Sequence, residues 1–245
     1  MIDIPIICYS HSSYSDLWEM FFGQVNKYFY RSKQYLFTDK ADGIHDKQVV
    51  LFDDNKSYPE RVTNCLESVK EDMCIFMHED MILYDTPVYS KLYKIITFLR
   101  EYNIDYVKLL RGGHDENIAL DDMPIDNLWW IPHSSTRLSF AIQPTIWKVD
   151  KLLEVYRESA KPTIQGIAAI GNFETGASDY VNNSNIKGLY WYDDEKKRGR
   201  HHWDSYLFPH GNFISKGRWV YSEYSKELTQ LHKEYNIDKN IRGVI

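Results

Sequence analysis

The chain has 245 residues, 43% of them hydrophobic and 26% charged, so it can bury the core of one large α/β domain without disulfides or a structural metal. Its net charge of −6 argues against a general nucleic-acid binder, because such proteins bind phosphates through an excess of Lys and Arg. The three cysteines lie in apolar patterns without metal-binding spacing, and the sequence has neither a signal-peptide pattern nor a membrane-spanning run, which predicts a cytoplasmic protein.

The first predicted unit is a core strand over 4–9, followed by the polar turn 10–13 and an amphipathic helix over 15–30. A strand, a polar turn and a helix N-terminus together form a natural nucleotide site, because free N–H groups at the helix end attract phosphate. The glycine-rich fingerprint of dinucleotide-binding proteins is absent here, which makes a dinucleotide cofactor a weak interpretation.

Two further strands follow, one over 34–39 that ends in Asp39 and one over 48–52 that runs into Asp53 and Asp54. Asp39 could accept hydrogen bonds from a base or a ribose, or could simply be a turn residue. A helix over 58–70 follows, and Arg61 in its first turn either faces a phosphate or is solvated.

The most informative stretch is an apolar strand over 74–77 that runs into His78, Glu79 and Asp80 and then into apolar residues again. Two carboxylates are thereby held at the carboxyl end of a core strand, where open α/β sheets bind their ligands. A hard divalent cation that also grips a diphosphate would offset their loss of hydration. The alternative is that the acidic pair only begins a surface loop.

The alternation of strands and helices continues with a helix over 88–99 and a strand over 106–110, and predicts a largely parallel sheet covered by helices. The segment 111–135 breaks this alternation as a long loop, which carries Trp129 and Trp130.

The remaining chain contains a strand over 138–147, a helix over 149–156 and a loop over 171–180 that feeds a short helix. Residues 188–218 are rich in aromatic and basic side chains, and 223–235 have weak helical spacing. No internal repeat is present.

The order of these parts resembles a GT-A type glycosyltransferase, specifically the compact single-domain sugar transferases of bacteria and viruses. The resemblance rests on the first strand with its polar turn, on 58–61, 76–80 and 140–148, and on Asn172-Phe173-Glu174. In that family the acidic element is Asp-x-Asp or a variant, whereas here His78 stands in place of the first aspartate.

The resemblance implies a single α/β domain over 1–245 with a mixed, largely parallel sheet flanked by helices. Residues 1–110 would form the nucleotide-binding half and 111–222 the acceptor and sugar half, with 223–245 as a C-terminal tail. The implied donor is a UDP-, GDP- or dTDP-sugar, and the implied acceptor a saccharide or lipid-linked glycan, as in polysaccharide biosynthesis.

By the same resemblance, Asp80 would be the main ligand of a Mn²⁺ or Mg²⁺ ion that bridges the donor diphosphate. Further ligands would be Glu79, His78 and His210. The nucleotide and its phosphates would be bound by Ser10, His11, Asp39, Arg61, Lys216 and Arg218. The sugar and acceptor would contact Trp129, Trp130, Gln143 and Trp147.

Glu174 is the candidate base, because an inverting transferase needs a carboxylate that removes the proton of the acceptor hydroxyl. Asp179 is the nearby substitute. If the enzyme instead retains anomeric configuration, Glu174 is not a base and only the metal site stands.

Three other functions remain open at the level of sequence. A nucleotidyltransferase shares the sheet and acidic site, but the turn 10–13 lacks the Gly and Lys that it would ordinarily carry. A non-catalytic carbohydrate-binding protein explains the aromatic residues but not the acids at strand ends. A glycoside hydrolase could use Glu79 and Glu174 as its paired carboxylates.

Overall fold

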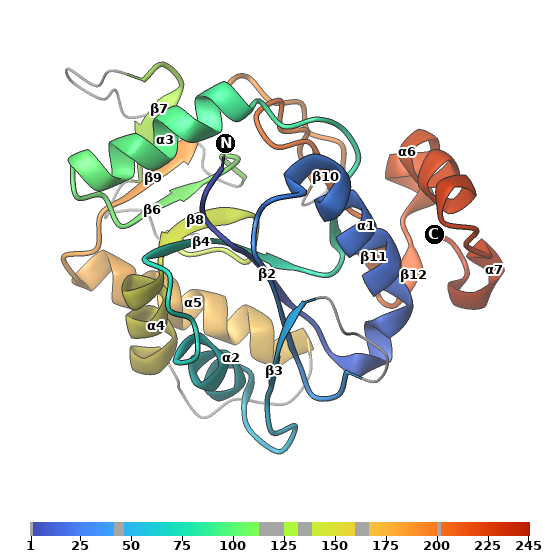
Figure 1. Cartoon of the computed structure of the whole chain (residues 1–245), viewed down its shortest axis with the longest axis horizontal. Coiled ribbons are helices and arrows are strands. Elements are labelled where there is room, and N and C mark those ends of the chain that lie inside the picture. Colours follow the sequence, from blue (N-terminus) through green and yellow to red (C-terminus); the bar gives the residue numbers. More distant parts are fainter. Residues whose placement is uncertain (1, 42–46, 113–124, 132–138, 160–166, 200–201) are drawn as a thin grey trace.

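The computed structural model describes residues 2–41, 47–112, 125–131, 139–159, 167–199 and 202–245. Within these, one sheet of eight strands in the order β3-β2-β1-β4-β8-β6-β9-β7 forms the centre of the molecule, with helices on both faces (Figure 1). The predicted class, a mixed and largely parallel sheet flanked by helices, is confirmed.

The N-terminal half of the sheet is parallel. It consists of β1 (Ile6–Tyr9), β2 (Gln34–Thr38), β3 (Gln48–Leu51) and β4 (Met73–His78). Buried residues fill β1 and most of β2 and β4, as expected for strands covered on both faces.

The other half of the sheet is mixed. Here β8 (Thr145–Lys148) runs antiparallel between β4 and β6 (Tyr106–Lys108), β9 (Gly188–Trp191) is parallel to β6, and β7 (Leu128–Trp130) is an antiparallel edge. Because β4, β6 and β9 share one direction, their carboxyl ends meet the amino end of β8 along the edge where β1 and β2 also end. We call this the carboxyl edge.

Two hydrophobic cores lie on the two faces of the sheet. One face carries the 3₁₀ helix η1 (Ser12–Leu17), α1 (Trp18–Phe29) and α3 (Tyr89–Glu101). The other carries α2 (Tyr58–Leu66), α4 (Val149–Glu158) and α5 (Ile167–Asn183), which lie together in Figure 1. No helix in the described part of the chain has the length and apolar character needed to cross a bilayer.

Small elements complete the chain near the carboxyl edge and on the flank of α1. The strand β5 (Met81–Leu83) pairs with β10 (His210–Asn212), and β11 (Ile214–Ser215) forms a hairpin with β12 (Arg218–Trp219). The chain ends in α6 (Tyr221–Glu234) and α7 (Lys239–Arg242), drawn in red at the side of the molecule in Figure 1.

Several predicted elements differ from the structure. The segment 111–135, predicted as a long loop, contains strand β7. The segment 171–180, predicted as a loop that feeds a short helix, lies inside helix α5. The reason is packing: Phe173, Ala177 and Val181, spaced four residues apart, are buried against the second core, and tertiary contacts outweigh the cost of glycine in a helix. The strand predicted over 138–147 is shorter, since β8 begins only at Thr145.

Close packing between β6 and β9 depends on Gly188. Its register partner is Tyr106, whose ring is fully buried and stacks on Trp147 with centroids 4.1 Å apart. A methyl group on Gly188 would lie 2.0 Å from the Tyr106 ring, far inside van der Waals contact. Glycine at this position therefore allows β6 and β9 to pair closely, so that the polar residues at their carboxyl ends lie side by side.

We predict that Gly188→Ala lowers the unfolding free energy by about 1–3 kcal/mol or more, because the added methyl group overpacks a filled core. The control is Gly217→Ala in the β11–β12 turn, where the added methyl group contacts nothing within 4 Å and only the positive φ of 75° opposes it. Urea unfolding of both variants tests this. A Gly188→Ala variant as stable as the wild type would show that β6 and β9 can separate without cost.

Candidate active site

Polar and charged side chains from six segments meet at the carboxyl edge. The turn after β1 lies between the ends of β2 and β4, where the strand order reverses and where open sheets bind ligands. The other segments follow β6 and β9 and precede β8. The arrangement thus joins the predicted nucleotide turn and acidic motif to residues from the second half of the chain.

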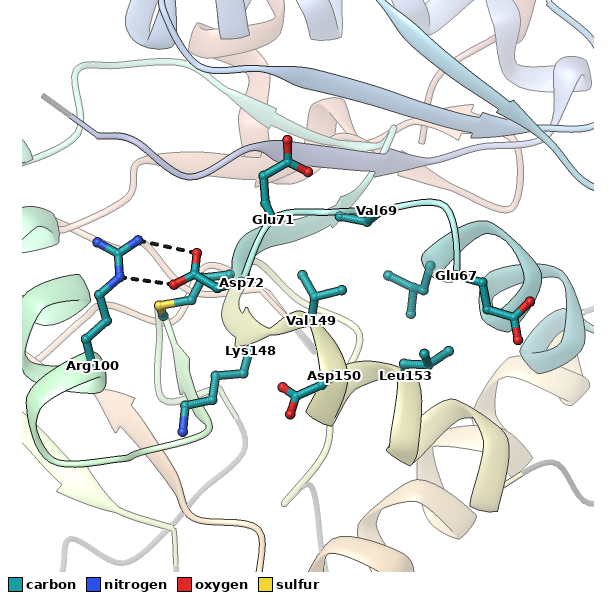
Figure 2. Close-up of a pocket in the computed structure, with 11 residues that line it drawn as sticks. Glu67, Val69, Glu71, Asp72, Arg100, Lys148, Val149, Asp150 and Leu153 are labelled. Carbon is teal, nitrogen blue, oxygen red and sulfur yellow. Dashed lines mark hydrogen bonds and ion pairs between the residues drawn. The ribbon is translucent and has the colours of Figure 1, made fainter.

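A cavity of about 420 Å³ lies at the opposite edge of the sheet (Figure 2). Its residues include Met73 and Lys148, which are register partners at the amino end of β4 and the carboxyl end of β8. Its basic groups are already paired, Arg100 with Asp72 and Lys148 with Asp105. This cavity contains none of the predicted site residues, so we do not treat it as the active site.

The nucleotide side of the carboxyl edge is built on Asp39, which follows β2. Its carboxylate accepts two hydrogen bonds of 2.7 Å from Ser12, one from the backbone N–H and one from Oγ. Burial raises the pKa of Asp39, but these hydrogen bonds outweigh it and lower the pKa below its ordinary value. His11 Nε2 lies 3.8 Å from Asp39 and 3.4 Å from Asp54. The predicted pair His11 and Asp39 is thus brought together.

Arg61 belongs to the same cluster, but its donors are directed to the loop before α2. Its Nη2 lies 2.9 Å from Oδ1 of Asp54, and its Nε donates to the carbonyl of Lys56 at 2.8 Å. The guanidinium also lies over the ring of Phe52, 5.3 Å from its centroid. Arg61 therefore fixes the loop that carries Asp54 beside His11.

The acidic pair lies between β4 and β5. Glu79 is 9% exposed, and Asp80 is half-buried. Burial, together with the neighbouring charge of Asp80, raises the pKa of Glu79 to about 8. Burial likewise raises the pKa of Asp80 to about 6. Ser10, whose Oγ accepts a 2.7 Å hydrogen bond from the indole N–H of Trp18, lies against Glu79 and favours its ionised form.

His78 lies in an aromatic cluster beneath the acidic pair. Its Nε2 is 3.0 Å from the hydroxyl of Tyr58, which is in turn 2.9 Å from the hydroxyl of Tyr156. Burial lowers the pKa of His78 to about 4, so the imidazole is neutral at physiological pH. With Nε2 engaged by Tyr58, His78 joins the acidic motif to α2 and α4.

Two basic residues near the acidic pair were not among the predicted site residues. Arg242 of α7 pairs with Asp16 and lowers the pKa of Glu79, and His202 lowers the pKa of Asp80. Arg242 reaches this position because the end of the chain folds back, with Ile245 N–H donating to the carbonyl of Trp219 at 2.9 Å. Nothing in the sequence pattern predicted that the C-terminal segment folds back toward the acidic pair.

His210 lies in β10, which pairs with β5 immediately after the acidic motif. Its Nδ1 is 2.8 Å from the carbonyl of Phe208, which leaves Nε2 as the nitrogen with a free lone pair. Burial lowers the pKa of His210 to about 4. A neutral imidazole with an oriented second nitrogen could ligate a metal, and the role of His210 as a metal ligand stays a prediction.

Glu174, the predicted base, projects from α5 to the segment before β8. Its Oε1 accepts a 2.7 Å hydrogen bond from the backbone N–H of Ile142. Burial raises its pKa, while this hydrogen bond and the nearby Lys108 lower it. The neighbouring Phe173 stacks on Tyr156 at 4.6 Å, so the aromatic cluster also fixes this part of α5.

Some predicted residues lie elsewhere. Asp179 is exposed and lies on a different face of α5 from Glu174. Trp147 does not line a sugar site, and that prediction is wrong: it is 2% exposed and lies mid-sheet, opposite Cys74 and Tyr106. Its position within a strand, rather than at its end, is the reason.

The other predicted sugar and phosphate ligands occupy the periphery. Trp129 and Trp130 are half-buried on the edge strand β7. Gln143 precedes β8 and donates from Nε2 to the carbonyl of Leu110 at 2.8 Å, at the carboxyl edge. The side chains of Lys216 and Arg218 are exposed on the β11–β12 hairpin, whose Gly217 carbonyl accepts a hydrogen bond from Arg242.

No protein-family model and no curated protein matches the sequence. Among solved structures, the chain is similar to TarS 1–349 from S. aureus (11% identity, TM-score 0.47, 78% of this chain and 60% of that one). The complex of that fragment with UDP-GlcNAc gives 13% identity and a TM-score of 0.49 over 98% and 69% of the two chains. Bifunctional IspDF from Campylobacter jejuni gives 10% and 0.48 over 79% and 50%. The chain therefore spans less than two thirds of the first TarS match and of IspDF.

The raised pKa of Glu79 gives a prediction with a definite sign. Its folded pKa of about 8 exceeds its ordinary 4.5, so the folded state binds the extra proton. This contribution to stability is fully present below the ordinary pKa and is lost as pH rises through the folded pKa. In EDTA, the wild type should therefore lose stability relative to Glu79→Gln between about pH 5 and 8, by up to about 1.4 kcal/mol per pH unit. Urea unfolding of both proteins measures the difference, and a difference that stays constant with pH would contradict it.

Proposed function

We propose that this protein is a metal-dependent glycosyltransferase that moves a sugar from a nucleoside-diphosphate sugar to a saccharide or lipid-linked glycan. The observation that carries the proposal is the meeting of two kinds of carboxylate at one sheet edge. The first is a buried acidic pair beside an ordered nucleotide-sized turn, and the second is Glu174 beside the entry to β8, the strand adjacent to the acidic strand β4.

The residues of the acidic motif fit a divalent cation that is completed by substrate. No group of three or more His, Cys, Asp or Glu side chains in the described residues is arranged to hold a metal unaided. Mg²⁺ and Mn²⁺ bound with a diphosphate, however, usually take one or two carboxylates from the protein and the remaining ligands from phosphate and water. Asp80 and Glu79 supply two carboxylates whose raised pKa values report incomplete compensation of their charge. A cation bound there would offset the charge that develops on the leaving diphosphate.

Asp39 and the turn 10–13 are proposed to bind the nucleoside. The Ser12–Asp39 hydrogen bonds hold this turn in one conformation before any ligand arrives, so little ordering is needed on binding. Arg242, whose charge lowers the pKa of Glu79, is proposed to bind a diphosphate oxygen.

Glu174 is proposed to accept the proton of the acceptor hydroxyl. As that oxygen forms its bond to the anomeric carbon, the proton passes to the Glu174 carboxylate. The bond from the anomeric carbon to the diphosphate oxygen breaks, and its electron pair leaves with the nucleoside diphosphate. The product has inverted anomeric configuration. A base whose pKa is raised toward the operating pH is well matched to this step.

Binding of a nucleoside diphosphate and a metal is the first test. UDP, GDP, dTDP and CMP are added separately, with Mn²⁺ or with EDTA, and the melting temperature is recorded. One nucleoside diphosphate should stabilise the protein only with Mn²⁺, by about 2.7 kcal/mol at 100 times its dissociation constant. Asp80→Asn should abolish this shift, whereas Asp85→Asn on the exposed loop after β5 should preserve it. The absence of any shift with a folded wild type would favour a carbohydrate-binding protein or a hydrolase.

Substitution of Glu174 tests the step itself. Glu174→Gln should retain the metal-dependent nucleotide shift but reduce turnover by about 10²- to 10⁴-fold, because the amide cannot accept the proton. Glu158→Gln, an exposed glutamate on α4, is the matched control. Transfer is measured as release of nucleoside diphosphate from each donor sugar that binds. Full activity of Glu174→Gln would refute the assignment of the base.

A further inference from the structure

A buried lysine lies at the carboxyl edge, and it was not among the site residues predicted from the sequence. Lys108 is the last residue of β6 and is 1% exposed. An ammonium group held out of water costs several kcal/mol unless carboxylates offset it. Burial accordingly lowers the pKa of Lys108 to about 7. The free-energy cost of burying this ammonium group raises the question of which neighbouring groups offset it.

The groups that offset Lys108 are two carboxylates from separate segments. Glu174 comes from α5 and Glu195 from the chain that follows β9, and both raise the pKa of Lys108. The topology brings them there: β6 lies between β8 and β9, and Lys108 is in register with Thr145 of β8 and Tyr190 of β9. The lysine therefore lies between the segment anchored by Glu174 and the segment that carries Glu195.

Both carboxylates also accept backbone hydrogen bonds that fix their positions. Glu174 binds the N–H of Ile142, and Glu195 Oε1 accepts the N–H of Arg111 at 2.7 Å. The other oxygen of Glu195 is buried without a hydrogen-bond partner among the described residues. Burial, together with the charge of Asp193, raises the pKa of Glu195 to about 7. Glu195 thus competes with Glu174 for the same cation.

Other titratable groups face this cluster but do not supply a positive charge to Glu174. Tyr58 of α2 and Tyr156 of α4 lie near Glu174, and burial raises the pKa of both phenols, which remain neutral. The guanidinium of Arg111 lies over the ring of Tyr192, 4.1 Å from its centroid, and stabilises the charge of Glu195. Among the residues that the structure describes, the cation that lowers the pKa of Glu174 is Lys108.

We infer that Lys108 is a positioning residue that holds Glu174 in its ionised form near neutral pH, and that Glu195 sets how much of this effect Glu174 receives. This inference rests on the proposed role of Glu174 as base. Since only the carboxylate can accept the acceptor proton, activity should rise with pH through the pKa of Glu174. Lys108, Glu174 and Glu195 together would then determine the pH at which the acid limb of the pH–rate profile lies.

Two substitutions should move that limb in opposite directions. Lys108→Met keeps the approximate volume but removes the cation, so the acid limb of kcat/KM should move to higher pH by about one unit or more. Glu195→Gln removes the competing carboxylate, so the limb should move to lower pH. A loss of stability alone would not produce shifts of opposite sign. Lys148→Met removes a half-buried lysine paired with Asp105 at the opposite edge of the sheet and should leave the limb unchanged.

A second readout does not depend on activity. Side-chain carboxyl carbons of Glu are titrated by ¹³C NMR in each variant, and the Glu174 signal is assigned by its loss in Glu174→Gln. Its pKa should rise in Lys108→Met and fall in Glu195→Gln. If Lys108→Met does not fold, the direction of the shift in Glu195→Gln decides. An unchanged Glu174 pKa in the folded variants would overturn the inference.

The two proposals fail in different ways. If Glu174→Gln is fully active, the base assignment and the catalytic meaning of Lys108 both fail, whatever the NMR titration shows. If Glu174→Gln is inactive but neither variant moves the acid limb, the proposed function stands and only the role of Lys108 is refuted.

Discussion

Charged side chains held out of water at the carboxyl edge are the constraint on which the rest of this structure depends. Lys108 and Glu79 are both buried, and each would destabilise the fold without compensation. Lys108 is offset within the protein by Glu174 and Glu195, whereas Glu79 adjoins another carboxylate, Asp80. The charge of Lys108 is thus compensated within the protein, whereas Glu79 and Asp80 repel each other. This difference supports the proposal that a cation binds at the acidic pair.

The mixed half of the sheet brings residues from the second half of the chain to the carboxyl edge, where these charged side chains lie. The antiparallel β8 between β4 and β6 brings Ile142 and Gln143 to the edge where β4 ends, and Ile142 there anchors Glu174. A wholly parallel sheet would need a further crossover at this point and would place the amino end of the strand at the opposite edge. The close approach of β6 to β9 at Gly188 sets the position of Lys108. The second half of the chain thus completes an edge begun by the first.

Rigidity is distributed unevenly around this edge. The turn after β1 is held by both Ser12–Asp39 hydrogen bonds, and the aromatic cluster joins His78, Tyr58 and Tyr156 across three elements. Preorganised donors and acceptors of this kind reduce the reorganisation that a reaction requires. The acidic pair, by contrast, is stabilised through Arg242 and His202, which come from the last quarter of the chain.

Local pattern was sufficient to predict the largely parallel sheet, the polar turn after the first strand and the acids at the end of β4, because these depend on strand and helix periodicity over a few residues. The resemblance to GT-A transferases selected Glu174 as a candidate but did not place it, since the helical state of α5 comes from packing of Phe173 against α4. The core position of Trp147, the involvement of Glu195 and Lys108, and the return of Arg242 all depend on contacts between residues distant in sequence. Only the tertiary structure decides these features, because burial and charge compensation are properties of neighbours in space.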